Sequence, residues 1–500
     1  MNYPEILTFL LFSPLAGLLI LLLLPKEEKE LIKNIAFIWS LIPFGLSIIL
    51  LFLFETNNPD FQFESMVRWI PSLNIYFHIG VDGISLFLIL LTTLSVSIVL
   101  LSSYNYIKAE EKLYYCMILL LESAMLGTFL SLDLILFFLF WEAMLIPMYF
   151  IIAIWGGERR VYATFKFVIY TSIGSVLMLL GIFYIGKISG SFSIADIYGT
   201  NFSYKEQVLL FGAFFLSFAI KVPLFPVHTW LPDAHVEAPT GGSVILAAIL
   251  LKMGTYGMLR FVIPLFPEAV STFAPSVMVL SVIGIVYAAM ASYVQRDIKK
   301  LVAYSSVSHM GLIVLGIFSL SSISISGGIY QMVSHGLSTG TLFLIVGILY
   351  ERRHTRLISE YGGIASVMPA FSTFFMIATL TSIAVPFTSG FAGEFMVLFG
   401  SYSSPFLNRI IEYGRLFVYI AASGMLFGAI YMLFAYQKII FGPNLKEENQ
   451  KLSDLTLREY LVLIPYAVLM IFMGINTRFI VDRVMPSVEK LIQIFNAGLK

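Results

Sequence analysis

The chain has 500 residues, of which 59% are hydrophobic and only 12% charged. Soluble proteins contain about 45–50% apolar and about 25% charged residues, so this composition excludes a water-soluble protein. The 30 Lys and Arg balance the 30 Asp and Glu, and the chain lacks the basic surface that nucleic-acid binding requires. The single cysteine, Cys116, excludes an internal disulfide, a Cys-based zinc site and a four-thiolate iron–sulfur cluster. We therefore expect no metal or cofactor in this chain, and any redox chemistry must belong to a partner chain.

Apolar stretches of about 20 residues recur along the whole chain, and each is long enough to cross a hydrocarbon core of about 30 Å. The sequence therefore predicts an all-α integral membrane protein with about fourteen transmembrane helices. The expected spans are residues 5–24, 34–54, 84–103, 113–130, 132–154, 167–186, 208–227, 240–262, 275–294, 300–318, 326–350, 371–400, 416–437 and 459–477.

The positive charges between the spans predict the orientation of the chain. Lys and Arg fall mainly in the odd-numbered loops, and such residues are retained on the cytoplasmic side of a membrane. Both termini should therefore face the outer, periplasmic side. A bacterial plasma membrane is the simplest location for a protein of this kind.

Prolines interrupt two of the spans. Pro223 and Pro226 lie in the seventh, and Pro386 lies in the twelfth, just before the glycine-rich run FTSGFAG. Interrupted helices at matching positions of two halves are typical of transporters built from inverted repeats, although coincidental prolines in a long membrane chain would look the same. Spans 4–8 and 9–13 form the two expected five-helix repeats. The predicted division is residues 1–112 with three transmembrane helices, 113–262 and 263–440 as the repeats, and 441–500 with a loop, the last transmembrane helix and a tail.

Among the ionisable residues inside predicted spans four stand out, namely Glu142, Lys221, Lys252 and Glu394. A charge at the centre of a membrane helix costs about 2.5–3.5 kcal/mol on insertion scales. Such residues therefore need a partner or water, and they usually face the interior of the helix bundle. They are the first candidates for a functional site.

Glu142 and Lys221 have two interpretations. They could form a neutralising ion pair that only holds two helices together. Alternatively the pair is switchable, because Lys221 directly precedes the Pro223 break, where freed backbone groups admit water and allow the ammonium to move. A movable carboxylate would then control whether the lysine keeps its proton. Lys252 lies too deep to reach the membrane surface, and Tyr256 is one turn away.

Two histidines extend this polar line. His309 shares a helix face with Ser305, while His335 lies between Gln331 and Thr339 on another helix. A single membrane histidine is often a hydrogen-bonding residue that joins helices. With an unperturbed pKa of about 6.5, however, histidine is also a natural stepping stone for protons.

The segment WLPDAHVEAP contains Asp233, His235 and Glu237, residue types that could ligate a metal. Its two prolines predict a loop, and no further ligands lie near in the sequence. A mouth that supplies protons to Lys252 is the preferred interpretation.

Three other carboxylates are weaker candidates. Glu122 is either a second internal carboxylate or a residue that hydrogen-bonds across a helix contact. Asp82 and Asp133 lie at predicted helix starts and are expected to cap them.

Several long motifs resemble a known family. Between about residues 121 and 441, the sequence is similar to subunit M of respiratory complex I, which is subunit 4 in mitochondria. The similar strings are FFLFWEAMLIPMYFIIAIWGGERRVYATFKF, KVPLFPVHTWLPDAHVEAPTGGSVILAAILLKMGTYG, DIKKLVAYSSVSHMGL and QMVSHGLSTGTLFLIVGILYERRHTR. The resemblance implies an antiporter-like subunit in the membrane arm of a proton-pumping NADH:quinone oxidoreductase.

The resemblance also implies roles, partners and cofactors. Glu142 and Lys221 would interact, Lys252 would be the central lysine of a proton channel, and Glu394 its terminal carboxylate. His309 and His335 would lie on the hydrophilic axis between them. Neighbouring L-like and N-like antiporter subunits would be partners, and NADH, FMN, iron–sulfur clusters and quinone would bind to other chains.

Three rival functions remain at this stage. The chain could be a subunit of a multisubunit sodium/proton antiporter, a passive scaffold for other subunits, or an independent solute carrier. The stretch HVEAPTGGSVILAAILLKMGTYG favours complex I over the antiporters, and the absence of a long lateral helix after the last span disfavours the L subunit. The lack of a polar cluster besides the proton-titratable line disfavours a solute carrier.

Overall fold

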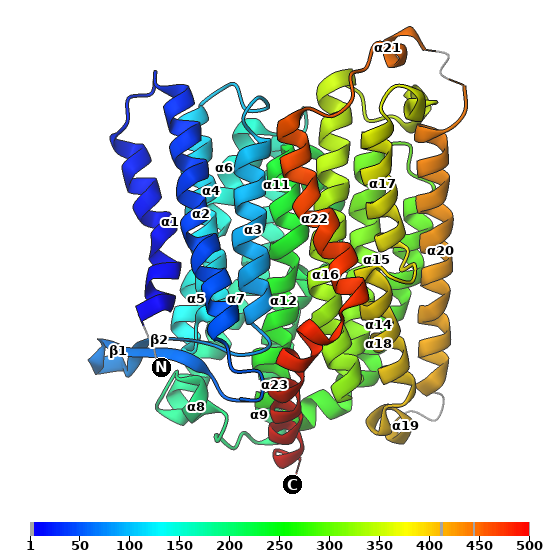
Figure 1. Ribbon diagram of the computed structural model, residues 1–500. Coiled ribbons are helices and arrows are strands. Elements are labelled where there is room, and N and C mark those ends of the chain that lie inside the picture. Colours follow the sequence, from blue (N-terminus) through cyan, green and yellow to red (C-terminus); the bar gives the residue numbers. More distant parts are fainter. Residues whose placement is uncertain (1–4, 411–413, 444–445, 500) are drawn as a thin grey trace.

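The computed structural model describes residues 5–410, 414–443 and 446–499, and it is a bundle of helices that run roughly side by side (Figure 1). Within these residues, eleven helices are long and apolar enough to cross a membrane, and two shorter apolar helices join them. The predicted fold class, an α-helical integral membrane protein, is confirmed. Each of the fourteen predicted spans overlaps a helical segment, and the number of membrane crossings stays a prediction.

The N-terminal part contains three helices and one hairpin that the sequence analysis did not predict. The hairpin is antiparallel and lies across one end of the bundle (Figure 1). Its strands mix apolar and charged residues, so no hydrophobic run marked them. The elements are α1 (Glu5–Leu23), α2 (Lys29–Leu53), β1 (Gln62–Ile70), β2 (Ile75–Val81) and α3 (Leu86–Ser102).

The next part extends to residue 265 and includes two interruptions. Its first elements are α4 (Glu111–Leu130), α5 (Leu134–Ala143), α6 (Leu145–Trp155), α7 (Arg160–Ser189), α8 (Ile194–Ile197), α9 (Tyr204–Lys221) and α10 (Trp230–Glu237). The fifth predicted span is thus split between α5 and α6. Pro147 explains the break, because it cannot donate a hydrogen bond to the carbonyl four residues earlier, that of Ala143. The kink directly follows Glu142.

A fully buried helix at Thr240–Leu265 closes this part of the chain. It alternates between α and π geometry, in the order α11 (Thr240–Ile245), η2 (Leu246–Leu250), α12 (Leu251–Gly257), η3 (Met258–Val262) and α13 (Ile263–Leu265). Turns of π-helix are rare and occur often at functional sites, because the wider turn displaces backbone carbonyls from their usual partners. Lys252 lies in the short α turn between the two π turns.

The second half is built around α16, which is also fully buried. Helices α15, α17, α18 and α22 pack against it. The elements are α14 (Pro267–Tyr293), α15 (Ile298–Phe318), α16 (Ser322–Arg353), α17 (Pro369–Ser382), α18 (Ser389–Tyr402), α19 (Pro405–Ile410), α20 (Gly414–Ile440), α21 (Glu447–Gln450), α22 (Leu457–Ile475) and α23 (Arg478–Ala497).

The C-terminal tail is a helix, α23, rather than an unstructured segment. Its buried residues Ile480, Val484, Val488 and Leu491 follow a helical repeat and form one apolar stripe. Charged residues occupy its other faces, so its composition did not match that of a transmembrane span. Helix α1 begins and α23 ends at the end of the bundle where the hairpin lies (Figure 1).

Both interruptions predicted from prolines are present. Helix α9 ends at Lys221 and α10 begins at Trp230, whose indole N–H donates to the Ile220 carbonyl at 2.8 Å. This bond satisfies one carbonyl that the break leaves without a helical partner. Helices α17 and α18 are separated by residues 383–388, where Ala384 and Phe387 have φ of 57° and 70°. Positive φ is strained for such residues.

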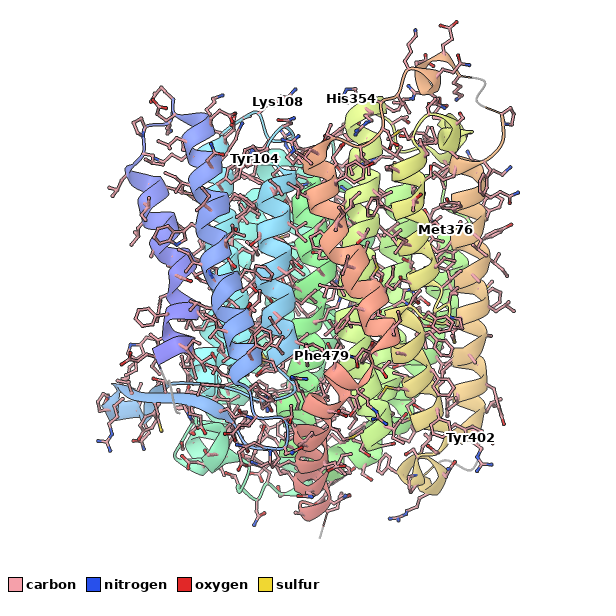
Figure 2. The ribbon with its side chains drawn as sticks, in the orientation of Figure 1. Tyr104, Lys108, His354, Met376, Tyr402 and Phe479 are labelled. Carbon is pink, nitrogen blue, oxygen red and sulfur yellow. The ribbon has the colours of Figure 1, made fainter. Side chains whose placement is uncertain are left out.

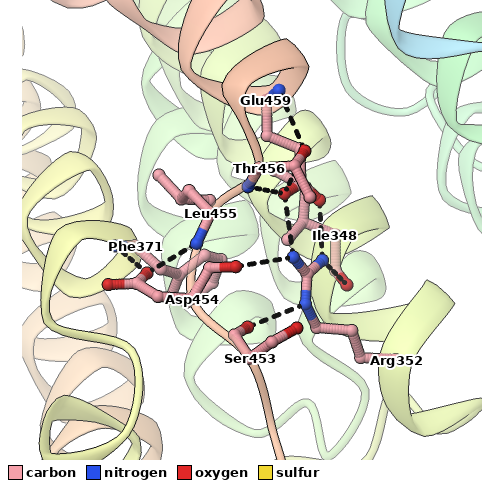
Figure 3. Close-up of polar contacts among 8 residues, drawn as sticks. All are labelled: Ile348, Arg352, Phe371, Ser453, Asp454, Leu455, Thr456 and Glu459. Atoms are coloured by element: carbon pink, nitrogen blue, oxygen red, sulfur yellow. Dashed lines mark hydrogen bonds and ion pairs between the residues drawn. The ribbon is translucent and has the colours of Figure 1, made fainter.

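Arg352 joins three helices (Figure 3), at the end of the bundle opposite α23 (Figure 1). Its guanidinium donates to both carboxylate oxygens of Glu459 at 2.7 and 2.8 Å, and to the backbone carbonyls of Ser453 and Asp454. The Asp454 carboxylate in turn accepts from the backbone N–H groups of Ala370 and Phe371. The C-terminus of α16 is therefore fixed to the N-termini of α17 and α22.

Candidate functional site

Lys252 and His335 form the centre of the candidate site. The Lys252 Nζ lies 2.7 Å from His335 Nδ1 and donates to the Ala247 carbonyl at 2.5 Å. That carbonyl belongs to the π turn η2, which explains how a buried ammonium finds an acceptor on its own helix. Both side chains are buried, with 0% and 1% of each residue exposed, and the second ring nitrogen of His335 has no hydrogen-bond partner among the described residues.

The line continues from His335 to Glu394. The rings of His335 and His309 lie with their centroids 5.5 Å apart, and His309 Nδ1 is 3.0 Å from Glu394 Oε1. Gln331 also donates to this oxygen, at 3.2 Å. Lys252, His335, His309 and Glu394 therefore form one row, although they come from four separate helices, α12, α16, α15 and α18.

A small cavity lies beside His309 and Glu394. The cavity has a volume of about 20 Å³. One water molecule needs about 15 Å³, so the cavity is about 30% larger than this minimum. Ser382 at the α17 break and Tyr431 of α20 line it, and Ser382 Oγ is 3.5 Å from His309 Nε2. The lining is mixed, but its polar groups from Ser382, Tyr431, His309 and Glu394, together with the volume, make this a place where water can join the row.

Lys221 and Glu142 are brought to the same region but not into direct contact. Lys221 Nζ donates to the thioether of Met144 at 3.1 Å and lies 4.8 Å from the centre of the Trp141 ring. No ion pair within 4.0 Å joins it to a carboxylate of the described residues, and Glu142 Oε1 has no hydrogen-bond partner there. Glu142 is nevertheless the charged group that acts on Lys221 at longer range.

The segment with Asp233, His235 and Glu237 is a helix, α10, and not the predicted loop. The prolines explain the error. Pro232 lies in the first turn of α10, where a missing N–H costs little, and Pro239 follows the helix end. Proline at these two positions flanks a short helix as readily as it marks a loop.

Two of the three side chains of α10 share a partner, because the Arg159 guanidinium lies 4.0 Å from Asp233 and 3.9 Å from Glu237, whereas His235 has a different neighbour. Asp233 pairs with Lys166 at 2.7 Å, and Glu237 accepts from the Arg159 backbone N–H at 2.9 Å. His235 stacks on the Phe343 ring with 4.5 Å between centroids, and neither of its ring nitrogens has a hydrogen-bond partner among the described residues. The arrangement does not gather the three as one ligand set.

A polar cavity of about 160 Å³ lies where α10 ends. Glu237, Lys299 and Arg356 line it, with Lys299 donating to the Ala238 carbonyl at 2.5 Å and Arg356 to the Val236 carbonyl at 2.6 Å. Two cations at the C-terminus of a helix complement its dipole. Figure 2 shows Lys108 and His354 at this same end of the bundle.

Sequence reasoning missed Lys299 and Arg260 as parts of buried polar sites. Both lie near the ends of predicted spans, where a basic residue normally reaches water. For Arg260 a signal existed, because it follows Lys252 and Tyr256 at steps of four residues. Its partner is Asp82, at 2.7 Å.

The structure also shows the surroundings of the other predicted carboxylates, Glu122, Asp133 and Asp82. Glu122 is fully buried on α4, and neither carboxylate oxygen has a hydrogen-bond partner among the described residues. Asp133 caps α5 by accepting from the N–H groups of Ile135 and Leu136. Asp82 accepts from the backbone N–H groups of Ile84 and Ser85 in the turn before α3, whose N-cap is Ser85 without a side-chain cap bond. The capping prediction is therefore confirmed for Asp133 and wrong for Asp82.

A helical membrane bundle with interrupted helices and a buried row of Lys, His and Glu defines an antiporter-like transport protein. The profile of the family described as NADH:quinone oxidoreductase/Mrp antiporter, TM, matches residues 131–411, more than half of the chain. The chain belongs to this family. It is 44% identical to NADH-ubiquinone oxidoreductase chain 4 of Marchantia polymorpha over 488 residues, which are 97% of each chain.

Other relatives point to the same branch of the family. NADH-quinone oxidoreductase subunit M of Rickettsia bellii is 44% identical over 497 residues, covering 98% of this chain and 99% of the relative. A chain of respiratory complex I from Thermus thermophilus has a TM-score of 0.88 and 29% identity, covering 98% of this chain and 99% of that one. A chain of the Mrp complex from Dietzia sp. DQ12-45-1b shares the fold, with a TM-score of 0.84, 18% identity and 99% of both chains covered.

Proposed function

We propose that this chain is a membrane-arm subunit of an NADH:quinone oxidoreductase that moves protons along the row from Lys252 to Glu394. One observation carries the proposal: four titratable side chains from four helices meet in one line, with a 2.7 Å contact at one end and a 3.0 Å contact at the other. Lys252, His335 and Glu394 are buried, and the His309 side chain is 12% exposed. Burying such groups is expensive in a membrane, and a purely structural role needs no line.

The proposed path begins at the cavity beside Glu237 and Lys299. Lys299, which lines this cavity, and Lys252 are both charged groups that act on His235. A proton taken up at this end passes to Lys252, then through His335 and His309 to Glu394. Each transfer breaks one N–H or O–H bond and forms another, so no covalent intermediate arises.

Lys221 and Glu142 provide the coupling. Met144 and Trp141 hold the ammonium without neutralising it, because a thioether and an aromatic face are weak partners for a cation. A conformational change that moves Glu142 toward Lys221 would change the field at Lys252. Moving one charge against 100 mV requires about 2.3 kcal/mol, which is within the range of coupling between neighbouring sites, about 1–3 kcal/mol.

Membership of the family supports a proposal for the partner chains of this subunit. Quinone reduction in partner chains would drive the coupling, and NADH, FMN and iron–sulfur clusters would bind there, since we expect no redox site in this chain. L-like and N-like antiporter subunits would be its neighbours. The protein would lie in a bacterial plasma membrane with both termini outside, so protons would move from the cytoplasm outward. Of its fourteen predicted helices, ten would form two inverted five-helix repeats, residues 113–262 and 263–440.

Lys252→Met tests the proposal in the assembled complex. Reconstituted in sodium-free vesicles, it should oxidise NADH but translocate fewer protons per electron pair, because the central carrier of the row is lost. Lys187→Met, at an exposed position near the end of α7, is the control for assembly. Unchanged proton stoichiometry in a correctly assembled Lys252→Met complex would leave the chain as a scaffold.

A sodium/proton antiporter subunit is the second candidate, favoured by the shared fold of the Mrp complex chain. The same vesicles distinguish the two functions. Proton uptake that is driven by NADH and independent of sodium supports the complex I function. A proton flux that requires sodium and exchanges for it supports the antiporter function.

A further inference from the structure

An apolar groove of about 470 Å³ lies on one face of the bundle, between α2 and α22. Helix α3 packs against both of these helices and lies between them (Figure 1). On α22, the lining residues Ile464, Val468 and Phe472 are 42%, 57% and 40% exposed, so the groove is open to the surroundings of the bundle. The proposed proton path does not use this groove.

Two prolines account for the hollow. Pro43 lies inside α2 and Pro465 inside α22. A proline inside a helix removes one backbone hydrogen bond and favours a bend. The lining of both helices starts beside these prolines, at Phe44 and Ile464, and continues toward the ends of α2 and α22 that lie near the hairpin and α23. The groove therefore occupies the half of the bundle that carries the hairpin and α23.

The lining favours an apolar occupant of limited size. Every described residue that lines the groove is apolar, and a buried water needs about 2–4 polar partners. At about 30 Å³ for each water-sized group, the groove holds about fifteen carbon atoms, which is the size of one acyl chain of a membrane lipid. A transmembrane helix, about 10–12 Å in diameter with its side chains, occupies several times the volume of the groove.

Arg483 places a positive charge at the α23 end of the groove. Phe479 lines this end, and Arg483 Cζ lies 4.6 Å from the centre of the Phe479 ring. The guanidinium donates to the Phe479 carbonyl at 2.7 Å. No carboxylate of the described residues lies within 4.0 Å of the Arg483 guanidinium, and its Nε has no hydrogen-bond partner among them.

The charges around this end of the groove favour an anion. Arg478, at the start of α23, is exposed, and it forms no ion pair with a described residue. Arg478 and Arg483 together outnumber Asp482, the acidic residue in the same turn of α23. An arginine presents several N–H donors in a plane, a geometry that matches the oxygens of a phosphate. A phospholipid combines such a phosphate with an acyl chain that extends into the membrane.

We propose that the groove holds one acyl chain of an anionic phospholipid, whose phosphate binds to Arg483. The chain extends from Phe479 toward the centre of the bundle, between α2 and α22. Val333 and Leu337, which flank His335 on α16, also line the groove. The bound chain therefore packs against the turn of α16 that carries His335. This binding site does not depend on the proposed function.

Photolabelling of the assembled complex tests the proposal. The complex is reconstituted in phosphatidylcholine vesicles with a small fraction of phosphatidylglycerol that carries a diazirine near the end of one acyl chain. Mass spectrometry of the labelled peptides should locate the label near Leu94 of α3 and Ile464 of α22, the lining residues of these helices farthest from α23. Unlabelled phosphatidylglycerol should displace this label, although phosphatidylcholine is present in excess.

Arg483→Gln tests the phosphate contact. Because hydrogen bonds from a charged donor are lost, labelling inside the groove should fall about tenfold or more relative to labelling elsewhere on the bundle. Arg409→Gln, at an exposed position on α19 at the same end of the bundle, is the matched control and should leave the labelling unchanged. Equal labelling of the groove in Arg483→Gln and the wild type overturns the proposal.

Leu90→Trp keeps the proposal testable if Arg483→Gln does not assemble. Leu90 lines the groove on α3, and the larger side chain should fill it and abolish its labelling. Leu461→Trp, exposed on α22 and outside the lining, is the control and should be labelled like the wild type. Unchanged labelling in Leu90→Trp overturns the proposal.

Two other occupants are distinguished by the same measurement. A phosphatidylcholine with the same diazirine that labels the groove as strongly as the phosphatidylglycerol overturns the role of the anionic headgroup. A photoreactive quinone with an isoprenoid tail that labels the groove, and that phosphatidylglycerol does not displace, overturns the phospholipid as the occupant.

Discussion

Lys252 combines two properties that a proton carrier needs, a buried ammonium and an acceptor that can take its proton. Its contact with His335 Nδ1 is 2.7 Å, and the Ala247 carbonyl holds it in place. A lysine changes its protonation state readily when it is buried, whereas arginine stays protonated in proteins. Proton transfer along the row therefore requires Lys252 to lose its proton, and a fixed positive charge at this position is not sufficient.

Lys252→Arg separates these two properties. The variant keeps a positive charge near His335 but cannot release a proton, so proton translocation should fall about tenfold or more while NADH oxidation by the assembled complex continues. Proton uptake per NADH oxidised is the measurement. Lys300→Arg, at the start of α15, controls for the larger side chain. Normal pumping by Lys252→Arg would show that fixed charge alone is sufficient.

Some helices and strands could be predicted from the sequence, and others could not. Long apolar runs identified the spans, and prolines identified the breaks at Pro223 and Pro386, because both signals are local. The hairpin and α23 alternate apolar and charged residues and matched no membrane pattern. The kink after Glu142 was readable from Pro147, but the π turns beside Lys252 were not, since tertiary packing decides them.

The residues of the candidate site could also be predicted only in part. Lys252, His335 and Glu394 were predicted because ionisable groups in apolar spans stand out in the sequence. Their contacts with one another depend on four helices meeting, which no local pattern contains. Lys299 and Arg260 were missed because their burial is also a property of the packed bundle.

Arg352 and its partners Ser453, Asp454 and Glu459, which we call the Arg352 clamp, join the ends of three helices. The loss of these contacts should lower the stability measurably. Glu459→Gln removes the charge opposite Arg352, whose side chain is 13% exposed. A hydrogen bond to a charged group contributes about 1.5–3 kcal/mol, so the apparent melting temperature in detergent should fall by several degrees. Glu447→Gln, whose pair with Lys451 is largely exposed, should cause little change. Equal melting temperatures for both variants would contradict a stabilising role for the clamp.

At the scale of the whole molecule, two polar regions lie at opposite ends of one buried helix pair. The cavity beside Lys299 lies at the end rich in positive loops, and a cavity of about 480 Å³ lined by Asp82 and Arg260 lies at the end with α23 and the hairpin. Helices Thr240–Leu265 and α16 connect them and carry Lys252 and His335. The fold thus supplies a buried core at mid-depth and polar openings at both ends, which is the arrangement that vectorial proton transfer needs.

The central claim is that Glu394 changes its protonation state through His335 during turnover. Infrared difference spectroscopy of the reconstituted complex, reduced with NADH, measures this change as a carboxyl C=O band. We expect this carboxyl band to be lost in Glu394→Gln and strongly diminished in His335→Leu, while quinone reduction continues in both variants. A carboxyl band that persists unchanged in His335→Leu, or in Glu394→Gln, would contradict it.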